Sequence, residues 1–307
     1  MKRLLVIVNP YATTVSDRLK NLVVHALRGS FAVDAVDTER REHATELCRQ
    51  AAATGTYDAV LAFGGDGTVN EAANGLVGSD LPLMILPGGR VNVFCRLLGM
   101  PGDVVDATEH VLGLADVWHP RPVDLGVANG RFFVVNSGFG LDAAVVERVD
   151  AHPARKARLG DYYYAWASTS IFSSRYLVRP PRLSVTLPGG EQVGGVTLIV
   201  QNARPYTYFG ERPVELAADV AVDSGDLAGI VLRETTPLAV PTIAWRMLSR
   251  NAQIGDHRQI TAFDSADGLT AHAEGDVPIP LQVDGDYIGD FTRVSYSVLP
   301  GGLSVLT

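Results

Sequence analysis

The sequence predicts an α/β protein with two domains: a doubly wound α/β domain and then a mostly antiparallel β-sandwich. Up to residue 120, short apolar runs alternate with helical patterns, which is typical of a parallel sheet covered by helices. Beyond that point, short strands follow one another with turn signals between them. We expect domains at residues 1–120 and 121–298, with the tail 299–307 returning to the first domain.

In the first domain, each expected strand is a short apolar run and each expected helix has an apolar face. Ser16 is the expected cap of the first helix. The expected strands are 4–8, 31–37, 60–63 and 81–86, and the expected helices are 16–27, 42–54, 68–76, 92–98 and 104–112. Asn9, Thr38 and two glycine-rich loops follow these strands, where ligands bind in doubly wound folds.

In the second domain, Asn129-Gly130 and Pro188-Gly189-Gly190 are hairpin signals. Helices near 162–174 and 237–248 interrupt the strands. The expected strands are 123–127, 132–136, 182–187, 196–202, 227–232, 259–263, 281–283 and 294–298.

The most informative stretch is Gly64-Gly65-Asp66-Gly67-Thr68 with the residues that follow it. A buried strand ends here, and glycines allow positive φ and close approach to a ligand. Thr68 with Glu71 has the spacing of a capping box for the next helix. A glycine turn before a helix N-terminus predicts phosphate binding, whereas a plain strand-to-helix connection is the alternative. Asp66 repels a bare phosphate, so it indicates a bound metal ion or a role with a hydroxyl proton.

Composition limits the classes of protein. A net charge of −8 argues against a nucleic-acid partner. Cys48 and Cys95 lack metal-ligand spacing, and we interpret them as small buried hydrophobes in a reducing compartment. The apolar run at residues 4–8 is too short for a signal peptide, and none approaches the roughly 20 residues of a membrane span. We therefore expect a cytoplasmic protein whose membrane contact is peripheral.

The string GGDGTVNEAANGL at residues 64–76 resembles the signature of the diacylglycerol kinase catalytic domain. That superfamily includes sphingosine and ceramide kinases and soluble bacterial lipid kinases. NAD kinases share only the GGDG core. Asn9-Pro10 and Thr38 are similar to family residues near the nucleotide, with Thr13 among the small residues that follow.

The segment from Leu86 to Gly99 is similar to the family's second block, with Arg90 for the usual threonine and Val93 for the aspartate. Arg90 can hold phosphate oxygens through two hydrogen bonds, and a solvated loop arginine is the alternative. The resemblance implies ATP with Mg²⁺, and it implies nucleotide contacts at Asn9, Pro10, Thr13, Thr38, Gly64, Gly65, Asp66, Gly67, Thr68, Asn70, Glu71, Gly89, Arg90 and Asn92.

Three further segments resemble segments of the same family. Residues 133–143 resemble the entry to the second domain, and we interpret their glycines and Asp142 as a bend and a helix cap. Lys156 and Arg158 beside an aromatic-rich helix suit a membrane interface, or a packed helix with a charged flank. In the loop where bacterial members hold a structural magnesium, Asp223 and Asp226 are the candidate ligands, with an acidic turn as the alternative.

Asp284-Gly285-Asp286 resembles the family's aspartate-glycine-glutamate, which implies that Asp284 is the general base and that Asp286 supports it. With Asp66, these are the expected catalytic residues, in an active site between the two domains. The resemblance implies an ATP-dependent lipid kinase that phosphorylates a primary hydroxyl, of diacylglycerol in the first instance. Sphingosine- or ceramide-type kinase, NAD kinase and a non-enzymatic lipid-binding protein stay open, and so does a homodimer.

Overall fold

The computed structural model describes residues 1–152, 161–171, 174, 176, 180–216, 220–234, 236, 239–249 and 253–307. The described chain forms two compact units, one of residues 1–125 with 300–307 and one of residues 126–299. Two strands run from one unit into the other, β5 (Arg121–Ala128) and β18 (Arg293–Val305).

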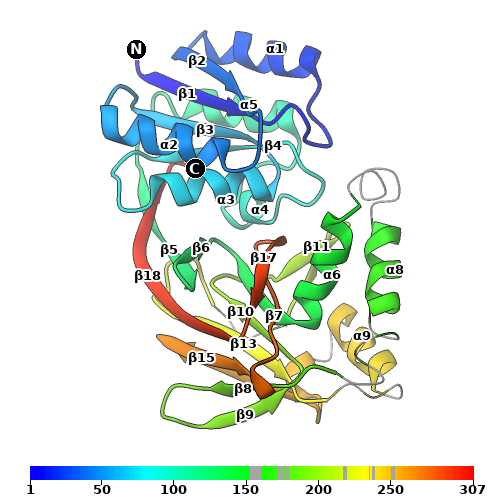
Figure 1. Ribbon diagram of the computed structural model, residues 1–307. Coiled ribbons are helices and arrows are strands. Elements are labelled where there is room, and N and C mark those ends of the chain that lie inside the picture. Colours follow the sequence, from blue (N-terminus) through cyan, green and yellow to red (C-terminus); the bar gives the residue numbers. More distant parts are fainter. Residues whose placement is uncertain are drawn as a thin grey trace. The chain divides into compact units, whose positions relative to one another are not determined.

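The first unit is built on a parallel sheet in the order β2-β1-β3-β4 (Figure 1). Its strands are β1 (Arg3–Val8), β2 (Ala32–Asp37), β3 (Ala59–Gly64) and β4 (Leu83–Pro87). The end of β18 adds to this sheet, where Val305 pairs in parallel with Leu83. β1, β3 and β4 consist almost wholly of buried apolar residues, as expected of strands covered on both faces.

Five helices belong to this unit: α1 (Asp17–Leu27), α2 (His43–Thr54), α3 (Asp66–Leu76), α4 (Val93–Leu97) and α5 (Val104–Gly113). The chain moves from β1 outward to β2, and then back across to β3 and β4. Right-handed crossovers therefore place α1 on one face of the sheet and α2 and α3 on the other. The packing agrees, because α2 contacts α3 and α1 contacts α5. The predicted doubly wound α/β unit is confirmed.

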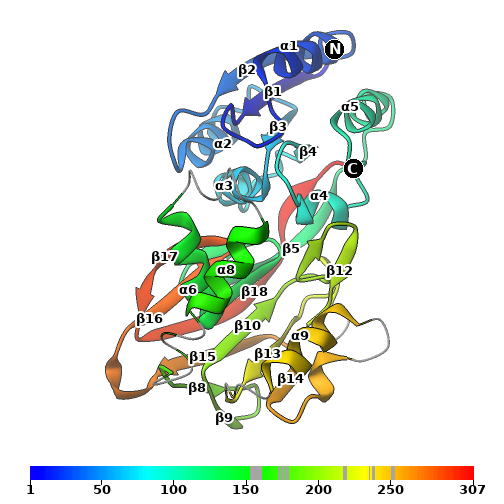
Figure 2. The same ribbon diagram turned by 90° about the vertical axis from the view of Figure 1, so that its right-hand side faces the viewer.

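The second unit contains an antiparallel sheet in the order β14-β13-β10-β7-β16-β17 (Figure 2). Its strands are β7 (Asn136–Gly140), β10 (Thr197–Gln201), β13 (Leu227–Leu232), β14 (Ile260–Ala266), β16 (Ile279–Val283) and β17 (Asp286–Phe291). The first part of β18 pairs antiparallel with β15 (Gly268–Ala273). In turn, β15 pairs with β8 (Leu183–Thr186), and β8 pairs with β9 (Gln192–Gly195). The smaller elements are β6 (Arg131–Phe133), β11 (Thr207–Phe209), β12 (Arg212–Val214), α6 (Leu141–Asp150), α8 (Asp161–Ile171) and α9 (Val240–Leu248).

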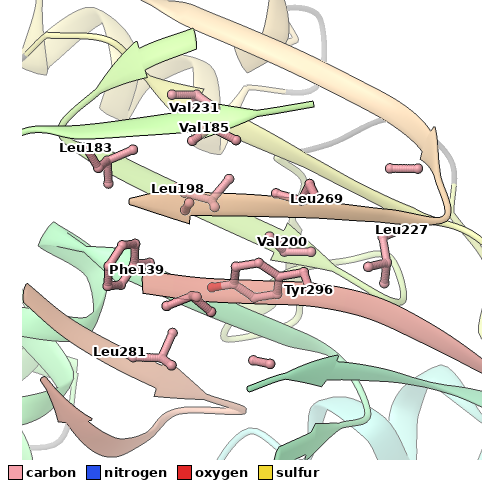
Figure 3. Close-up of a cluster of buried hydrophobic side chains, with 14 of the residues drawn as sticks. Phe139, Leu183, Val185, Leu198, Val200, Leu227, Val231, Leu269, Leu281 and Tyr296 are labelled. Carbon is pink, nitrogen blue, oxygen red and sulfur yellow. The ribbon is translucent and has the colours of Figure 1, made fainter. Parts of the chain in front are cut away.

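The core of the second unit lies between its two sheets. Figure 3 shows Leu198 and Val200 of β10 in the same cluster as Leu183 of β8 and Tyr296 of β18. Ile199, which lies between Leu198 and Val200, packs into a second buried cluster with residues of α6 and α8. Because neighbouring side chains of a strand point to opposite faces, the sheet around β10 is buried on both sides. The expected antiparallel β-rich second part is therefore confirmed.

Some expected elements differ from the structure. The single strand expected at 132–136 is two strands, β6 and β7, which are separated at Val134 and Val135. The strand expected at 294–298 is the 13-residue β18, which runs on into the other unit. Ser16 caps α1 as predicted, since its hydroxyl accepts from Leu19 N at 3.2 Å.

Candidate active site

Four loops begin side by side at the carboxyl edge of the parallel sheet. Three backbone hydrogen bonds join them: Thr38 N donates to Val8 O at 2.8 Å, Asn9 N to Phe63 O at 2.9 Å, and Gly88 N to Gly64 O at 2.8 Å. β1 lies between β2 and β3, so Asn9 and the glycine loop occupy the point at which the strand order reverses. Doubly wound sheets bind ligands at this point.

The glycine loop is compact because of close backbone approach. A Cβ on Gly65 would lie 3.2 Å from Gly89 Cα, and a Cβ on Gly88 would lie 2.8 Å from Gly64 Cα. The positive φ that glycine allows is not used here, since Gly64, Gly65 and Gly67 are not among the residues with that conformation. Gly65, Gly88 and Gly89 instead provide the space that lets the two loops lie backbone against backbone.

Asn9 connects the first loop to α3. Its Nδ2 donates to Thr68 Oγ1 at 3.0 Å, while its Oδ1 accepts from Tyr11 N at 3.0 Å. Pro10 beside it is half-buried, and Thr13 is exposed on the same loop. The side chain of Asn9 thus links the start of its own loop to the first turn of α3.

The predicted capping box is wrong. α3 begins at Asp66 with Gly65 at the N-cap, so Thr68 already lies inside the helix. Glu71 instead caps a neighbouring helix, because its carboxylate oxygens accept from Glu42 N at 2.9 Å and from Ala44 N at 3.2 Å at the start of α2. Asn70 is buried next to it, and its backbone and side-chain oxygens accept from Asn74 Nδ2 at 2.9 Å and 3.2 Å.

Asp66 is half-buried at the first position of α3, and its Oδ1 accepts from Phe94 N at 3.4 Å. The carboxylate therefore lies where the glycine loop meets the start of α4. Burial raises the pKa of the neighbouring Cys95 to about 12, and the negative charge of Asp66 adds to this shift. Cys48 is also buried with a pKa of about 12, so both cysteines are the buried thiols predicted from the sequence.

The second block forms a tight turn before α4. Asn92 has a φ of 52°, and its side chain bonds both backbone polar atoms of Gly89: Oδ1 accepts from Gly89 N at 2.8 Å, and Nδ2 donates to Gly89 O at 2.9 Å. This turn presents Arg90 as an exposed side chain. Asn92 therefore shapes the loop that carries Arg90.

In the second unit, Asp284 and Gly285 form the two-residue turn between β16 and β17. Their φ values of 47° and 81° are those of a type I′ hairpin turn. Asp284 Oδ2 accepts from Val134 N at 2.8 Å, and Oδ1 accepts from Val135 N at 2.9 Å and Asn136 N at 3.0 Å. Asp286 is half-buried at the start of β17, opposite Val283. The carboxylate of Asp284 is thus held by the segment between β6 and β7.

A polar network beside this turn was not predicted. Asp142 was interpreted as a helix cap, but its Oδ1 accepts from Tyr206 Oη at 2.5 Å and its Oδ2 from Gln282 Nε2 at 2.8 Å. Burial raises the pKa of Asp142, and the hydrogen bonds from Tyr206 and Gln282 oppose that rise. One signal was present in the sequence: Gln282 is a polar residue inside an otherwise apolar strand, two positions before Asp284.

The acidic loop before β13 places Asp223 exposed and Asp226 half-buried. Among the described residues, no group of three or more His, Cys, Asp or Glu side chains could hold a metal ion. Ala217 to Asp219, the start of this loop in the family pattern, lie outside the described residues.

In the aromatic-rich helix α8, the side chain of Tyr163 is buried, whereas Trp166 is 48% exposed. The two rings stack at 5.6 Å, and the Arg148 guanidinium lies 5.6 Å from the Trp166 ring centre. Lys156 and Arg158 lie outside the described residues. No helix within the part of the chain that the structure describes is long and apolar enough to span a bilayer.

Comparisons with known proteins bear on the family of this chain. Residues 3–127 match the family model described as the diacylglycerol kinase catalytic domain. A diacylglycerol kinase of Bacillus subtilis (strain 168) is 27% identical over 94% of this chain and 91% of its own. One of Mycobacterium tuberculosis (strain ATCC 25618 / H37Rv) is 27% identical over 91% of this chain and 85% of its own.

Solved structures show the same likeness. A structure from Bacillus anthracis str. Sterne, described provisionally as a diacylglycerol kinase, superposes with a TM-score of 0.76 at 27% identity. The match covers 99% of this chain and 96% of that one. Fold, glycine loop and relatives together define a lipid kinase. The family model and these relatives support the diacylglycerol kinase catalytic-domain superfamily and a lipid kinase enzyme, so the NAD kinase and non-enzymatic alternatives are set aside.

Proposed function

We propose that this protein is an ATP-dependent kinase that transfers the γ-phosphate to the primary hydroxyl of diacylglycerol or a related lipid. The observation that carries the proposal is the gathering of Asn9, Thr38 and the start of α3 at one edge of the parallel sheet. The names of the relatives favour diacylglycerol as the lipid.

The residues at this edge fit a nucleotide phosphate. The first backbone N–H groups of a helix have no acceptor within the helix, and the helix dipole favours an anion there. α3 has 11 residues and begins at Asp66, directly after Gly65. Gly65 and Gly89 have no side chain that would keep an anion away from the backbone. Arg90, exposed beside them, adds a guanidinium suited to phosphate oxygens.

Asp66 fits the same proposal if a cation accompanies the phosphates. A carboxylate at a phosphate site is repulsive alone but suits Mg²⁺, which is commonly bound by one or two carboxylates together with substrate phosphates. When bound, Mg²⁺ neutralises charge on the transferring phosphoryl group. Asp223 and Asp226 stay our proposal for a second, structural cation site.

The second unit supplies the proton acceptor in this proposal. A general base must lie within hydrogen-bond reach of the hydroxyl it deprotonates, and its orientation must be fixed. Three backbone N–H groups fix the carboxylate of Asp284. Asp286 follows directly after the turn and supports it.

The membrane surface is the proposed partner, as the source of the lipid. The exposed ring of Trp166 supports a peripheral contact, because amphipathic aromatic rings favour the headgroup level of a bilayer. Co-sedimentation with liposomes should weaken in Trp166→Ala and in a variant with Lys156 and Arg158 neutralised. Undiminished binding of both variants would remove this partner from the proposal.

The test of function is a labelled-ATP assay over diacylglycerol, sphingosine, ceramide and NAD. We expect label in diacylglycerol or another lipid alcohol, and none in NAD. Asp66→Asn should abolish turnover, whereas the matched control Asp17→Asn should not, because Asp17 also begins an 11-residue helix but is exposed and lies outside the proposed phosphate site. Appreciable lipid phosphorylation by Asp66→Asn would overturn the proposed site.

A further inference from the structure

Gln282 lies at the centre of the polar network behind the Asp284 turn. It is 1% exposed, and its side-chain nitrogen and oxygen are both engaged. Nε2 donates to Asp142 Oδ2 at 2.8 Å and to Asn136 Oδ1 at 3.0 Å, while Oε1 accepts from Gly285 N at 2.8 Å. The buried amide of Gln282 therefore links Gly285, which follows Asp284 in the turn, to the side chains of Asp142 and Asn136.

The chemistry of the neighbours fixes which way this amide points. Asp142 Oδ2 and Asn136 Oδ1 are both acceptors, so only the NH₂ end of Gln282 can face them. A flipped amide would place its oxygen against the Asp142 carboxylate and its NH₂ against Gly285 N–H. Tyr206 holds Asp142 from the other side through its hydroxyl at 2.5 Å. Each group in the network has a single suitable orientation.

Asn136 belongs both to this network and to the setting of Asp284. Its backbone N donates to Asp284 Oδ1 at 3.0 Å and its backbone O accepts from Asp284 N at 2.8 Å. Its side chain accepts from Gln282 at Oδ1 and donates to Tyr206 O at 3.0 Å. The strand pairing explains this, because Gln282 of β16 lies opposite Gly138 of β7, which brings Asp284 opposite Asn136. A Cβ on Gly138 would come within 3.0 Å of Gln282 Nε2, so glycine there leaves room for the amide.

We propose that Gln282 is a positioning residue that, with Asp142, Asn136 and Tyr206, sets the orientation of the Asp284 carboxylate. Gln282 fixes the turn from Gly285, and Asn136 fixes the carboxylate directly. A shift of the amide would move both supports of Asp284 together. This inference rests on the proposed role of Asp284 as the base.

Gln282→Glu tests the proposal with almost no change of shape. A protonated carboxyl at this position can still donate one hydrogen bond and accept from Gly285, whereas an ionised one has no donor and faces the oxygens of Asp142 and Asn136. The ionisable groups joined to the network or on the elements beside it include Asp142, Tyr206, Asp284, Asp286, Tyr287 opposite Gln282, Asp150 through Tyr287 N and, through Ser137, Tyr296. Because these groups are also present in the wild type, the informative quantity is the ratio of kcat in the variant to kcat in the wild type.

We expect that ratio to fall as the pH rises, by about tenfold per pH unit above the pKa of the introduced carboxyl. KM for the nucleotide should stay within about twofold, because the proposed phosphate contacts belong to other residues. The matched control is Gln259→Glu, which also buries a carboxyl in the second unit but removes only a donor to Thr236 Oγ1. The ratio of kcat in Gln259→Glu to kcat in the wild type should not vary with pH. A flat ratio for Gln282→Glu would overturn the proposal.

Backbone hydrogen exchange gives a second readout that does not need activity. In Gln282→Glu at high pH, the amides of Val134, Val135, Asn136 and Gly285 should exchange faster than in wild type, and in Gln259→Glu they should not. Unchanged exchange at these four amides would also overturn the proposal. If Gln282→Glu does not fold, Tyr206→Phe replaces it, with a lowered kcat, an unchanged nucleotide KM and the same faster exchange expected; unchanged kcat and exchange would contradict it.

The proposed function and the positioning role of Gln282 can be overturned by different results. The proposed function fails if the wild type labels no lipid, and the role of Asp284 as the base fails if Asp284→Asn retains turnover. The positioning role alone fails if the wild type is active and Asp284→Asn is inactive, but Gln282→Glu shows neither the pH dependence nor the faster exchange.

Discussion

Gly65 and Gly89 lie backbone against backbone, so that a Cβ on Gly89 would come within 2.7 Å of Gly65 Cα. Gly65 Cα is a backbone atom, so it cannot move aside as the end of a flexible side chain could. The loop after β3 and the loop after β4 therefore need glycine at position 89 for this approach, and a Cβ on Gly65, 3.2 Å from Gly89 Cα, would also press against it.

Gly89→Ala should separate these loops. We expect the free energy of unfolding to fall by about 1–3 kcal/mol, as in other overpacked sites, and nucleotide affinity to weaken. Gly102→Ala is the matched control, because a Cβ there would meet nothing within 4 Å. Denaturant unfolding and nucleotide titration check both effects, and equal behaviour of the two variants would contradict the packing argument.

Glu71→Ala should act on stability. Its carboxylate caps the start of α2 through Glu42 N and Ala44 N, so its loss should lower the free energy of unfolding by about 1 kcal/mol. Glu109→Ala, which removes an exposed glutamate from a helix of the same unit, is the control and should change stability little. If Glu71→Ala leaves stability intact but raises KM for the nucleotide, Glu71 contacts the nucleotide, as the family resemblance implies.

Arg90→Ala should weaken nucleotide affinity by about tenfold, the equivalent of one charge-assisted hydrogen bond. Arg18→Ala removes an exposed arginine of α1 as a control. Isothermal titration with ATP and Mg²⁺ measures both affinities. Equal affinities of the two variants would make Arg90 a solvated loop arginine.

Asp284→Asn should lose both activity and stability. An asparagine keeps one acceptor oxygen, but its NH₂ would face a backbone N–H that now donates to a carboxylate oxygen. We expect about 2 kcal/mol lower stability, from leaving a polar group unsatisfied, together with a large fall in kcat. Retained kcat in a folded variant would remove Asp284 from catalysis.

Cys48 and Cys95 should resist alkylation in the folded protein. Burial raises the pKa of each to about 12, so at about pH 8 their thiolate fractions are on the order of a thousandfold lower than in the unfolded chain. Iodoacetamide labelling with and without denaturant measures this ratio. Because the unfolded thiols lose their protons at lower pH than the folded ones, these two groups make stability fall as the pH rises above about 8.5.

The sequence was most informative where structure follows from local pattern. The apolar run ending at Val8 and the cap at Ser16 needed only neighbouring residues, and both are as predicted. Glu71 was misplaced because a capping box is a local rule, whereas the amides it serves belong to another helix, 27 and 29 residues away. Asp142 is similar, since its partners Tyr206 and Gln282 lie 64 and 140 residues further along the chain. Sequence spacing cannot show which distant donors a buried carboxylate will meet.

The return of β18 has a consequence for synthesis on the ribosome. Val305 pairs with Leu83, Leu306 N donates to Leu83 O at 3.0 Å, and Gly301 N donates to Asp124 Oδ1 at 2.8 Å. The residues that complete the first unit are therefore translated after the whole of the second. The nascent α/β unit must therefore wait with the side of β4 uncovered until residues 300–307 have been translated, so its final stabilisation comes later than the emergence of residues 1–125.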